Sequence, residues 1–119
     1  HATAIGKVLL AWLGDEELNA ILDGYAFTRF TPATLTDRDA LLAALAQTRH
    51  NYYALDNEEN EPGVRCIAVP VWNHESRVIA ALSLSTLTSR VNDDQLAACR
   101  QKLMEAGLGL SKTLGYRER

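Results

Sequence analysis

The sequence has few cysteines, no long apolar run and no excess of basic residues. Its two cysteines, Cys66 and Cys99, lie far apart in a chain of a size that folds without cross-links, so reduced thiols in the cytosol fit better than a disulfide. No apolar stretch approaches the roughly 20 residues that cross a bilayer, so we expect no membrane partner. Twelve basic and fifteen acidic residues give a net charge of −3. A domain that binds DNA phosphates needs a basic face, and this balance argues against one.

The composition is that of one globular domain. Hydrophobic residues make up 47% of the chain and charged residues 23%, which excludes disorder for most of it. A length of 119 residues corresponds to a single domain, which we assign to residues 1–119. The chain opens without an initiator Met or a secretory signal and enters a helical pattern almost at once. We therefore expect part of a longer protein, with N-terminal strands of the domain missing.

Apolar residues at helical spacing predict four helices. Thr3 is the expected N-cap of the first helix and Gly14 its end. The second begins at Asp15, the third at Thr36, and the fourth is capped by Asn92. The residues expected on their buried faces are Ile5, Val8, Leu9 and Trp12, then Leu18, Ile21, Leu22 and Tyr25, then Leu41, Leu42 and Leu45, and finally Leu96, Cys99, Leu103, Leu110 and Leu114.

Three strands are predicted between the third and fourth helices. A short one covers residues 52 to 55, and two longer ones, rich in Val, Ile and Leu, cover residues 64 to 71 and 78 to 86. The polar residues 73 to 76 between the long strands are typical of a hairpin loop. The order α, α, α, β, β, β, α predicts an α+β fold with an antiparallel sheet flanked by helices.

The two long strands place polar side chains on one face. Symmetric pairing about the hairpin loop sets Cys66 opposite Ser83 and Val64 opposite Ser85. Alternation then puts Cys66, Ser83 and Ser85 on one face with Ala68, and apolar residues on the other. Two hydroxyls and a thiol among small side chains leave room and hydrogen-bonding groups for a small molecule. The pattern is equally typical of a sheet face exposed to solvent, so both interpretations stay open.

Two other segments carry weaker signals for a binding site. The backbone N–H groups at the start of the first helix, residues 3 to 6, favour an anion, and Lys7 adds positive charge. An ordinary capped helix with a solvated lysine explains the same residues more simply. Asp56 begins an acidic loop at a strand end and points either into a cleft or into water. We expect most of the other acids of this loop to be solvated: Glu58, Glu59 and Glu61.

Together these segments resemble the C-terminal effector-binding domain of the IclR family of bacterial transcriptional regulators. The resemblance covers essentially the whole chain in order and spacing. It rests on HATAIGKVLL (1–10), TLT (34–36), DNEE (56–59), GVRCIAVPV (63–71), AALSLS (80–85) and SR (89–90). The opening residues also resemble the 2-keto-3-deoxygluconate repressor branch of the family.

The resemblance implies a GAF-like domain that senses a ligand without catalysis, cofactor or metal. It also implies a homo-oligomer, dimer or tetramer, whose DNA-binding winged helix-turn-helix is absent from this chain. Family members with known effectors bind small organic acids, which implies a keto or sugar acid as the partner here. By position, the amides of Ala4 and Ile5 would hold a carboxylate or keto oxygen, and Asp56 would accept from a ligand hydroxyl. The other implied ligand contacts are Val64 as an apolar wall and Cys66, Ser83 and Ser85 as hydrogen-bonding groups.

Two other classes of function compete with this interpretation. A cysteine-dependent enzyme would use Cys66 as nucleophile and a histidine as base. His74 follows Cys66 by eight residues along an extended strand, which sets the two well over 20 Å apart, whereas His1 and His50 are not placed by the sequence. The other alternative is a GAF- or PAS-like sensory module of another signalling protein. No paired His, Cys, Asp or Glu residues show the spacing of a structural zinc site.

Overall fold

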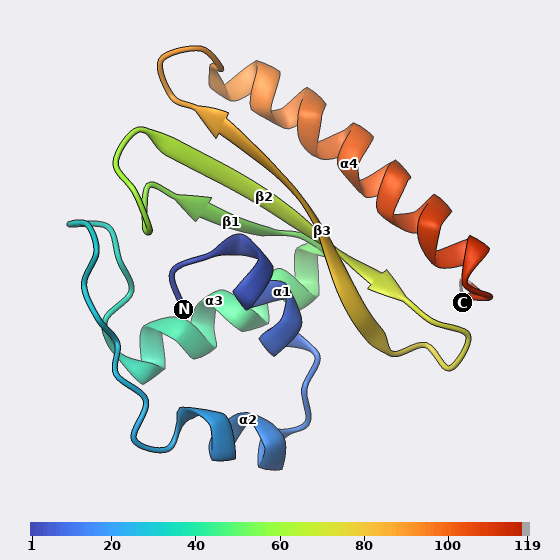
Figure 1. The fold of residues 1–119 in the computed structure, drawn as a ribbon, viewed down its shortest axis with the longest axis horizontal. Coiled ribbons are helices and arrows are strands. Elements are labelled where there is room, and N and C mark those ends of the chain that lie inside the picture. The colour runs from blue at the N-terminus through green and yellow to red at the C-terminus, as the bar shows by residue number, and fades with distance from the viewer. Residues whose placement is uncertain (118–119) are drawn as a thin grey trace.

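A computed structural model describes residues 1–117 as an α+β fold, which confirms the predicted class and order of elements (Figure 1). The helices of this part of the chain are α1 (Ala4–Ala11), α2 (Asp15–Leu22), α3 (Arg38–Asn51) and α4 (Asp93–Thr113). Its strands are β1 (Ala54–Asn57), β2 (Val64–Trp72) and β3 (Val78–Leu87). No helix in the described range is long and apolar enough to cross a membrane.

The strands form an antiparallel sheet in the order β1-β2-β3, with helices on both faces. On one face α1 packs through Ala4 and Val8 against Ala54 and Ala68. Helix α4 lies along the opposite face, where Gly107 approaches Val69. Val69 follows Ala68 on β2, so its side chain points to the other face of the sheet. Helices α1, α2 and α3 share a second apolar cluster, and α2 lies on the far side of α1 and α3 from the sheet (Figure 1).

The pairing of β2 with β3 differs from the predicted register by two residues. Cys66 faces Ser85 rather than Ser83, and Val64 faces Leu87 rather than Ser85. The hairpin closes at Asn73, whose N–H donates to the carbonyl of Arg77 at 2.9 Å, so the loop is offset by one residue. A bulge between Val71 and Trp72 adds a second residue. Because the two offsets add to an even number, the predicted division of side chains between the faces is preserved.

The caps of the helices are partly as predicted. Thr3 caps α1 by accepting from the N–H of Gly6, and Asn92 caps α4 in a capping box with Gln95. The predicted end of the first helix is wrong, because α1 ends at Ala11 and Gly14 is the N-cap of α2. The third helix is capped by Asp37 rather than Thr36.

The first strand begins later than predicted. Tyr52, at the end of α3, adopts a left-handed conformation with φ of 63°, which breaks the extended chain there. Strand β1 therefore starts at Ala54 and includes Asp56, which the sequence pattern placed in the loop.

The buried face of α1 is also different from the prediction. Ile5 and Leu9 are 41% and 42% exposed, whereas the buried positions are Ala4, Lys7, Val8 and Ala11. Small alanines bring the helix close to the sheet, and the lysine is buried because it has an acidic partner, described below. Four other predicted core residues are exposed as well: Ile21, Tyr25, Leu110 and Leu114.

Candidate effector-binding site

Three predicted site residues form a row across the sheet. Asp56 on β1 is directly opposite Cys66 on β2, and Cys66 is directly opposite Ser85 on β3. The next row along the same face contains Ala54, Ala68 and Ser83. Val64 lies on this face as well, two residues before Cys66. The sheet thus brings together all the strand residues that the sequence singled out.

Burial falls steadily across the row from β1 to β3. Asp56 is 3% exposed, Cys66 is half-buried and Ser85 is exposed. The Cys66 Sγ and Ser85 Oγ atoms lie 3.2 Å apart, within hydrogen-bond distance. The row therefore offers a buried carboxylate at one end and an accessible hydroxyl at the other.

Asp56 has one oxygen held by the backbone and one that is not. Its Oδ1 accepts from the N–H groups of Glu59 at 2.8 Å and Asn60 at 3.3 Å. No donor within residues 1–117 lies in hydrogen-bond range of Oδ2. Burial raises the pKa of this carboxyl above its usual value, and the two backbone N–H groups oppose that rise. The free oxygen can accept from a hydroxyl or, once protonated, donate to an acceptor.

The amino end of α1 lies beside the same rows of the sheet. Ala4 packs in one cluster with Ala54, Ala68 and the half-buried Cys66. Of the first four N–H groups of the helix, that of Gly6 is bound by the Thr3 side chain and that of Lys7 by the Thr3 carbonyl. Within the described part of the chain, the N–H groups of Ala4 and Ile5 have no acceptor. They are the two amides that the family resemblance assigned to a ligand oxygen.

Two charged residues at the site are buried, contrary to the sequence analysis. Lys7 and Glu59 are 4% and 7% exposed, and Lys7 Nζ lies 2.6 Å from Glu59 Oε1. Lys7 is therefore not the solvated lysine of the simpler interpretation, and Glu59 is not among the solvated acids of the loop. A signal existed in the sequence, because Lys7 falls between Ala4, Val8 and Ala11 on one helical face.

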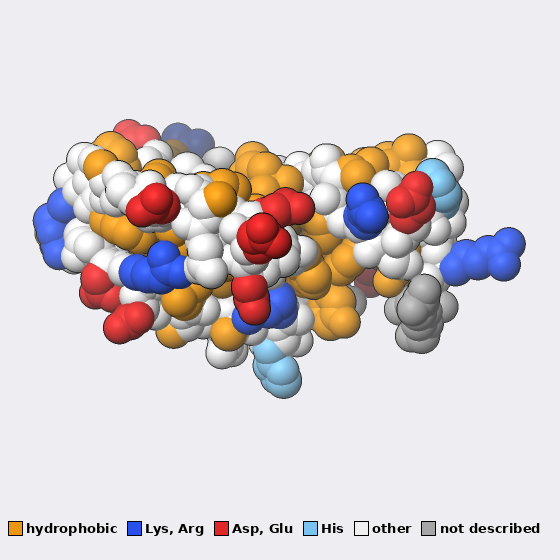
Figure 2. All heavy atoms as spheres, turned by 90° about the horizontal axis from the view of Figure 1, so that it is seen from below, with side chains coloured by type: hydrophobic (Ala, Val, Ile, Leu, Met, Phe, Trp, Pro, Cys, Tyr) orange, Lys and Arg blue, Asp and Glu red, His pale blue; other side chains and the backbone are white. Residues whose placement is uncertain are grey.

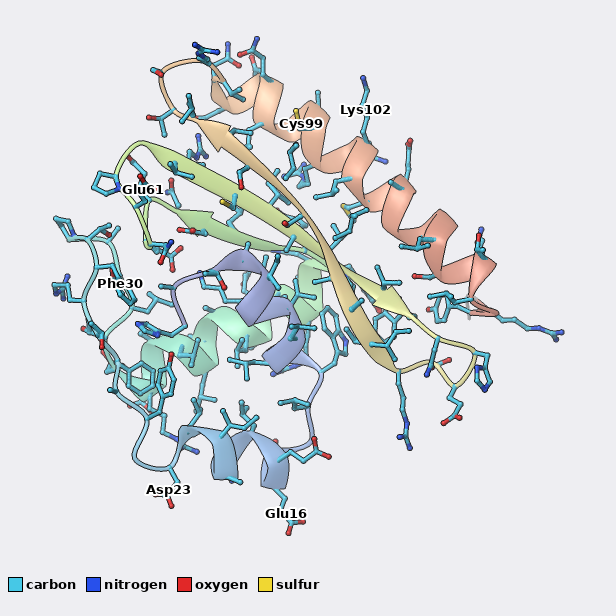
Figure 3. All side chains as sticks on the ribbon, in the orientation of Figure 1. Glu16, Asp23, Phe30, Glu61, Cys99 and Lys102 are labelled. Atoms are coloured by element: carbon cyan, nitrogen blue, oxygen red, sulfur yellow. The ribbon has the colours of Figure 1, made fainter. Side chains whose placement is uncertain are left out.

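The connection between α2 and α3, to which the sequence assigned no role, binds the acidic loop. The hydroxyl of Thr31 donates to the carbonyl of Glu58 at 2.6 Å, and that of Thr34 donates to the carbonyl of Glu59 at 2.5 Å. In Figure 3, Phe30 of this connection lies on the same side of the molecule as Glu61 of the loop. The acidic loop is thus held between α1 and this connection.

The thiol and histidine arrangement differs from that of a cysteine-dependent enzyme. Among described residues, Cys66 Sγ has Ser85 Oγ as its hydrogen-bonding neighbour. The His1 ring instead contacts the Tyr25 hydroxyl at 2.7 Å and the Thr28 carbonyl at 2.9 Å. Within residues 1–117 no group of three or more His, Cys, Asp or Glu side chains is arranged to hold a metal ion.

A groove of about 420 Å³ lies elsewhere, beside α4, and is lined mainly by apolar and aromatic side chains such as Trp72, Met104 and Tyr116. It contains none of the predicted site residues. The polar row is instead an open surface on the side of β3, whose outer edge has no partner strand within the described residues.

These features are those of a domain that binds a small molecule, and the comparison with protein families agrees. The family described as bacterial transcriptional regulator IclR, C-terminal, matches residues 1–112. The chain belongs to the IclR family, and it is the effector-binding domain of such a regulator.

Particular relatives support the assignment. The transcriptional regulator XynR of Escherichia coli K12 is 73% identical over 116 residues, which are 98% of this chain and 46% of XynR. The chain thus spans about half the length of this relative. The solved C-terminal domain of E. coli KdgR superposes with a TM-score of 0.90 at 45% identity, over 97% of this chain and 70% of that one.

A third relative was solved with a bound acid. The inducer-binding domain of the Acinetobacter transcription factor PobR, a double mutant in complex with 3-hydroxybenzoic acid, superposes with a TM-score of 0.84 at 37% identity. The match covers 98% of this chain and 65% of that chain. All three relatives are transcriptional regulators rather than enzymes.

Proposed function

We propose that this domain binds a small organic acid, of the keto or sugar acid class, between the amino end of α1 and the row formed by Asp56, Cys66 and Ser85. The observation that carries the proposal is the buried Asp56 carboxyl with one unbound oxygen, beside two unbound helix N–H groups. A carboxylate or keto oxygen is favoured at the positive end of a helix. A ligand hydroxyl would donate to Asp56 in a charge-assisted hydrogen bond.

The remaining contacts complete the proposed site. Ser83 and Ser85 would bind further hydroxyl or carbonyl groups, Cys66 would line the floor, and Val64 would form an apolar wall. The 3-hydroxybenzoic acid in the PobR relative carries both a carboxylate and a hydroxyl, the pair of groups that this site would bind. The resemblance of the opening residues to the 2-keto-3-deoxygluconate repressor branch makes that sugar acid the first candidate.

The effector would act on DNA binding by the rest of a cytosolic protein. XynR and its relatives are named as helix-turn-helix regulators, and this chain matches 46% of XynR. We propose that DNA is bound through an N-terminal domain outside this chain, in a homo-oligomer, either a dimer or a tetramer. An effector that binds one arrangement of the subunits better than another shifts the population between them, and with it the affinity for DNA.

A thermal-shift screen of the full-length protein tests the proposal. The acids are pyruvate, glyoxylate, 2-keto-3-deoxygluconate and 3-hydroxybenzoate, with neutral sugars as controls. A ligand at 100 times its Kd adds about 2.7 kcal/mol of stability, which raises the Tm by several degrees. Stabilisation by one acid class alone would support the proposal, and unchanged curves with every acid would contradict it.

A serine variant then tests the position of the site. Replacing Ser85 with alanine (Ser85→Ala) removes one hydrogen bond to the ligand, worth about 0.5–1.5 kcal/mol, so affinity for the acid should fall about two- to twelvefold. Isothermal titration calorimetry measures the Kd. The matched control is Ser89→Ala, an exposed serine beyond the end of β3. An unchanged Kd in Ser85→Ala, or an equal loss in both variants, would contradict the site.

A further inference from the structure

The buried ion pair between Lys7 and Glu59 is unusual for its place in the fold. It joins a helix near the start of the chain to a loop 52 residues later, and both side chains are nearly inaccessible to solvent. Removing two charges from water is costly, and a pair of apolar residues often stabilises a fold equally well. Stability alone therefore gives a weak reason for a charged pair at this position.

The hydrogen bonds of the pair surround Asp56 along the chain. Lys7 Nζ donates to the carbonyl of Leu55, the residue before Asp56, at 2.7 Å. Glu59 Oε2 accepts from the N–H of Asn57, the residue after Asp56, at 3.0 Å. The backbone N–H of Glu59 itself donates to Asp56 Oδ1. The pair thus holds the backbone on both sides of Asp56, and the carboxyl itself, in one orientation.

The same lysine connects this carboxyl to the other half of the proposed site. Lys7 lies within one turn of Ala4 and Ile5 on α1, whose N–H groups are unbound within the described residues. A helix is stiff over a single turn, so the position of the Lys7 backbone determines where those two groups point. Two of the three N–H groups of the Lys7 ammonium donate to Glu59 and Leu55, and the side chain is buried.

We infer that Lys7 and Glu59 are positioning residues of the effector site, and that their buried pair sets the spacing between the Asp56 carboxyl and the amino end of α1. The inference rests on the proposed function, in which an acid bridges the Asp56 carboxyl and the N–H groups of α1. The spacing between these groups would then select which acid binds. The pair acts through Asp56 and the helix, without touching the ligand.

A double variant separates positioning from stability. Lys7→Met together with Glu59→Leu in the full-length protein replaces the charged pair with an apolar pair of similar size, which avoids leaving one charge buried alone. The folded double variant should bind the acid effector at least tenfold more weakly than the wild type. In its crystal structure, the Asp56 carboxyl and residues 55–60 should be displaced relative to α1.

Two further variants test whether a loss of binding comes from the ion pair or from a general loss of stability. Leu45→Ala removes a fully buried side chain from the cluster shared by α1, α2 and α3, so it lowers stability away from the site and should leave the Kd unchanged. Glu59→Gln keeps the shape of the side chain but replaces one of its two acceptor oxygens with a donor, and it should weaken effector binding by a smaller factor than the double variant. This second variant decides the question if the double variant does not fold.

The outcomes for the two hypotheses are distinct. A double variant that keeps the wild-type Kd and an undisplaced Asp56 would overturn the positioning role. So would an equal loss of affinity in Leu45→Ala. If the wild-type protein binds none of the acids, the proposed function fails, and the crystal structure of the double variant still decides whether the pair positions Asp56.

Discussion

At the scale of single residues, the lack of a charged partner distinguishes Asp56 from Glu59, the other buried acid of this segment. Asp56 and Glu59 are both below 10% exposed, whereas Glu61 is exposed. Glu59 has a lysine partner, and Asp56 has only backbone N–H groups on one of its oxygens. This buried carboxyl without a charged partner is the chemically distinctive group of the domain, because burial disfavours its charged form.

The raised pKa of Asp56 predicts a pH dependence of stability that an asparagine removes. The folded protein holds this proton more tightly than the unfolded chain, because burial raises the pKa in the folded state. The contribution of Asp56 to stability is therefore complete below its unfolded pKa and is lost as the pH rises through the folded pKa. Asparagine does not ionise. The free energy of unfolding of Asp56→Asn should therefore increase relative to that of the wild type as the pH rises, and the two values should differ least in acid. Urea unfolding at a series of pH values measures the difference.

The control for this experiment is Asp23→Asn, at the exposed end of α2 (Figure 3). The pH dependence of Asp56→Asn should exceed that of this exposed variant over the same range. A constant difference for Asp56→Asn would show that burial does not perturb this carboxyl.

At the scale of elements, the two helices that cover the sheet approach it through small residues. Helix α1 uses Ala4, and α4 uses Gly107, which is buried against β2. A Cβ atom at Gly107 would lie 2.7 Å from Val69 Cγ2, closer than such atoms approach in folded proteins. The closeness of both helices is therefore a property of the small side chains and not of helical periodicity.

Two glycines of α4 give a matched pair of substitutions. Gly107→Ala should destabilise the domain by about 1–3 kcal/mol, because the helix must move away from Val69. Gly109→Ala meets nothing within 4 Å and should stabilise it by about 0.5–1 kcal/mol through helix propensity. Urea unfolding of both variants measures the contrast. Equal stability of the two would show that α4 is not in close contact with β2.

At the scale of the whole molecule, the charge distribution argues against direct binding of DNA by this domain. The net charge of the chain is −3, and Figure 2 shows acidic and basic side chains interspersed on the face seen from below. Phosphate contacts require basic groups gathered on one surface. We therefore expect the domain to influence DNA binding only through the arrangement of the subunits.

Removing exposed basic residues tests that expectation. Arg90→Ser alters an exposed position after β3, and Lys102→Ser alters an exposed position on α4 (Figure 3). In the full-length protein the double variant should keep the wild-type operator affinity. It should also keep the wild-type slope of log K against log salt, which has a magnitude of about 0.9 for each DNA phosphate that the protein neutralises. Fluorescence anisotropy over a salt series measures both, and a shallower slope would place this domain on the DNA.

Local patterns were enough to predict much of the fold and the face that carries the site. The caps at Thr3 and Asn92 depend on neighbours within three residues. The shared face of Cys66, Ser83 and Ser85 depends only on strand alternation, so it survived an incorrect register. The role of Asp56 came from the family resemblance, because a single acid at a strand end has no local signature of burial.

The sequence by itself determined the α+β class, the order of the elements and the two faces of the hairpin, because periodicity and turn chemistry act over a few residues. Only the tertiary structure decided which charges are buried. Whether Lys7 faces water or protein depends on Glu59, 52 residues away, and on a helix drawn close to the sheet by alanines. Such a pairing is set by which elements pack together, and no local pattern contains that information.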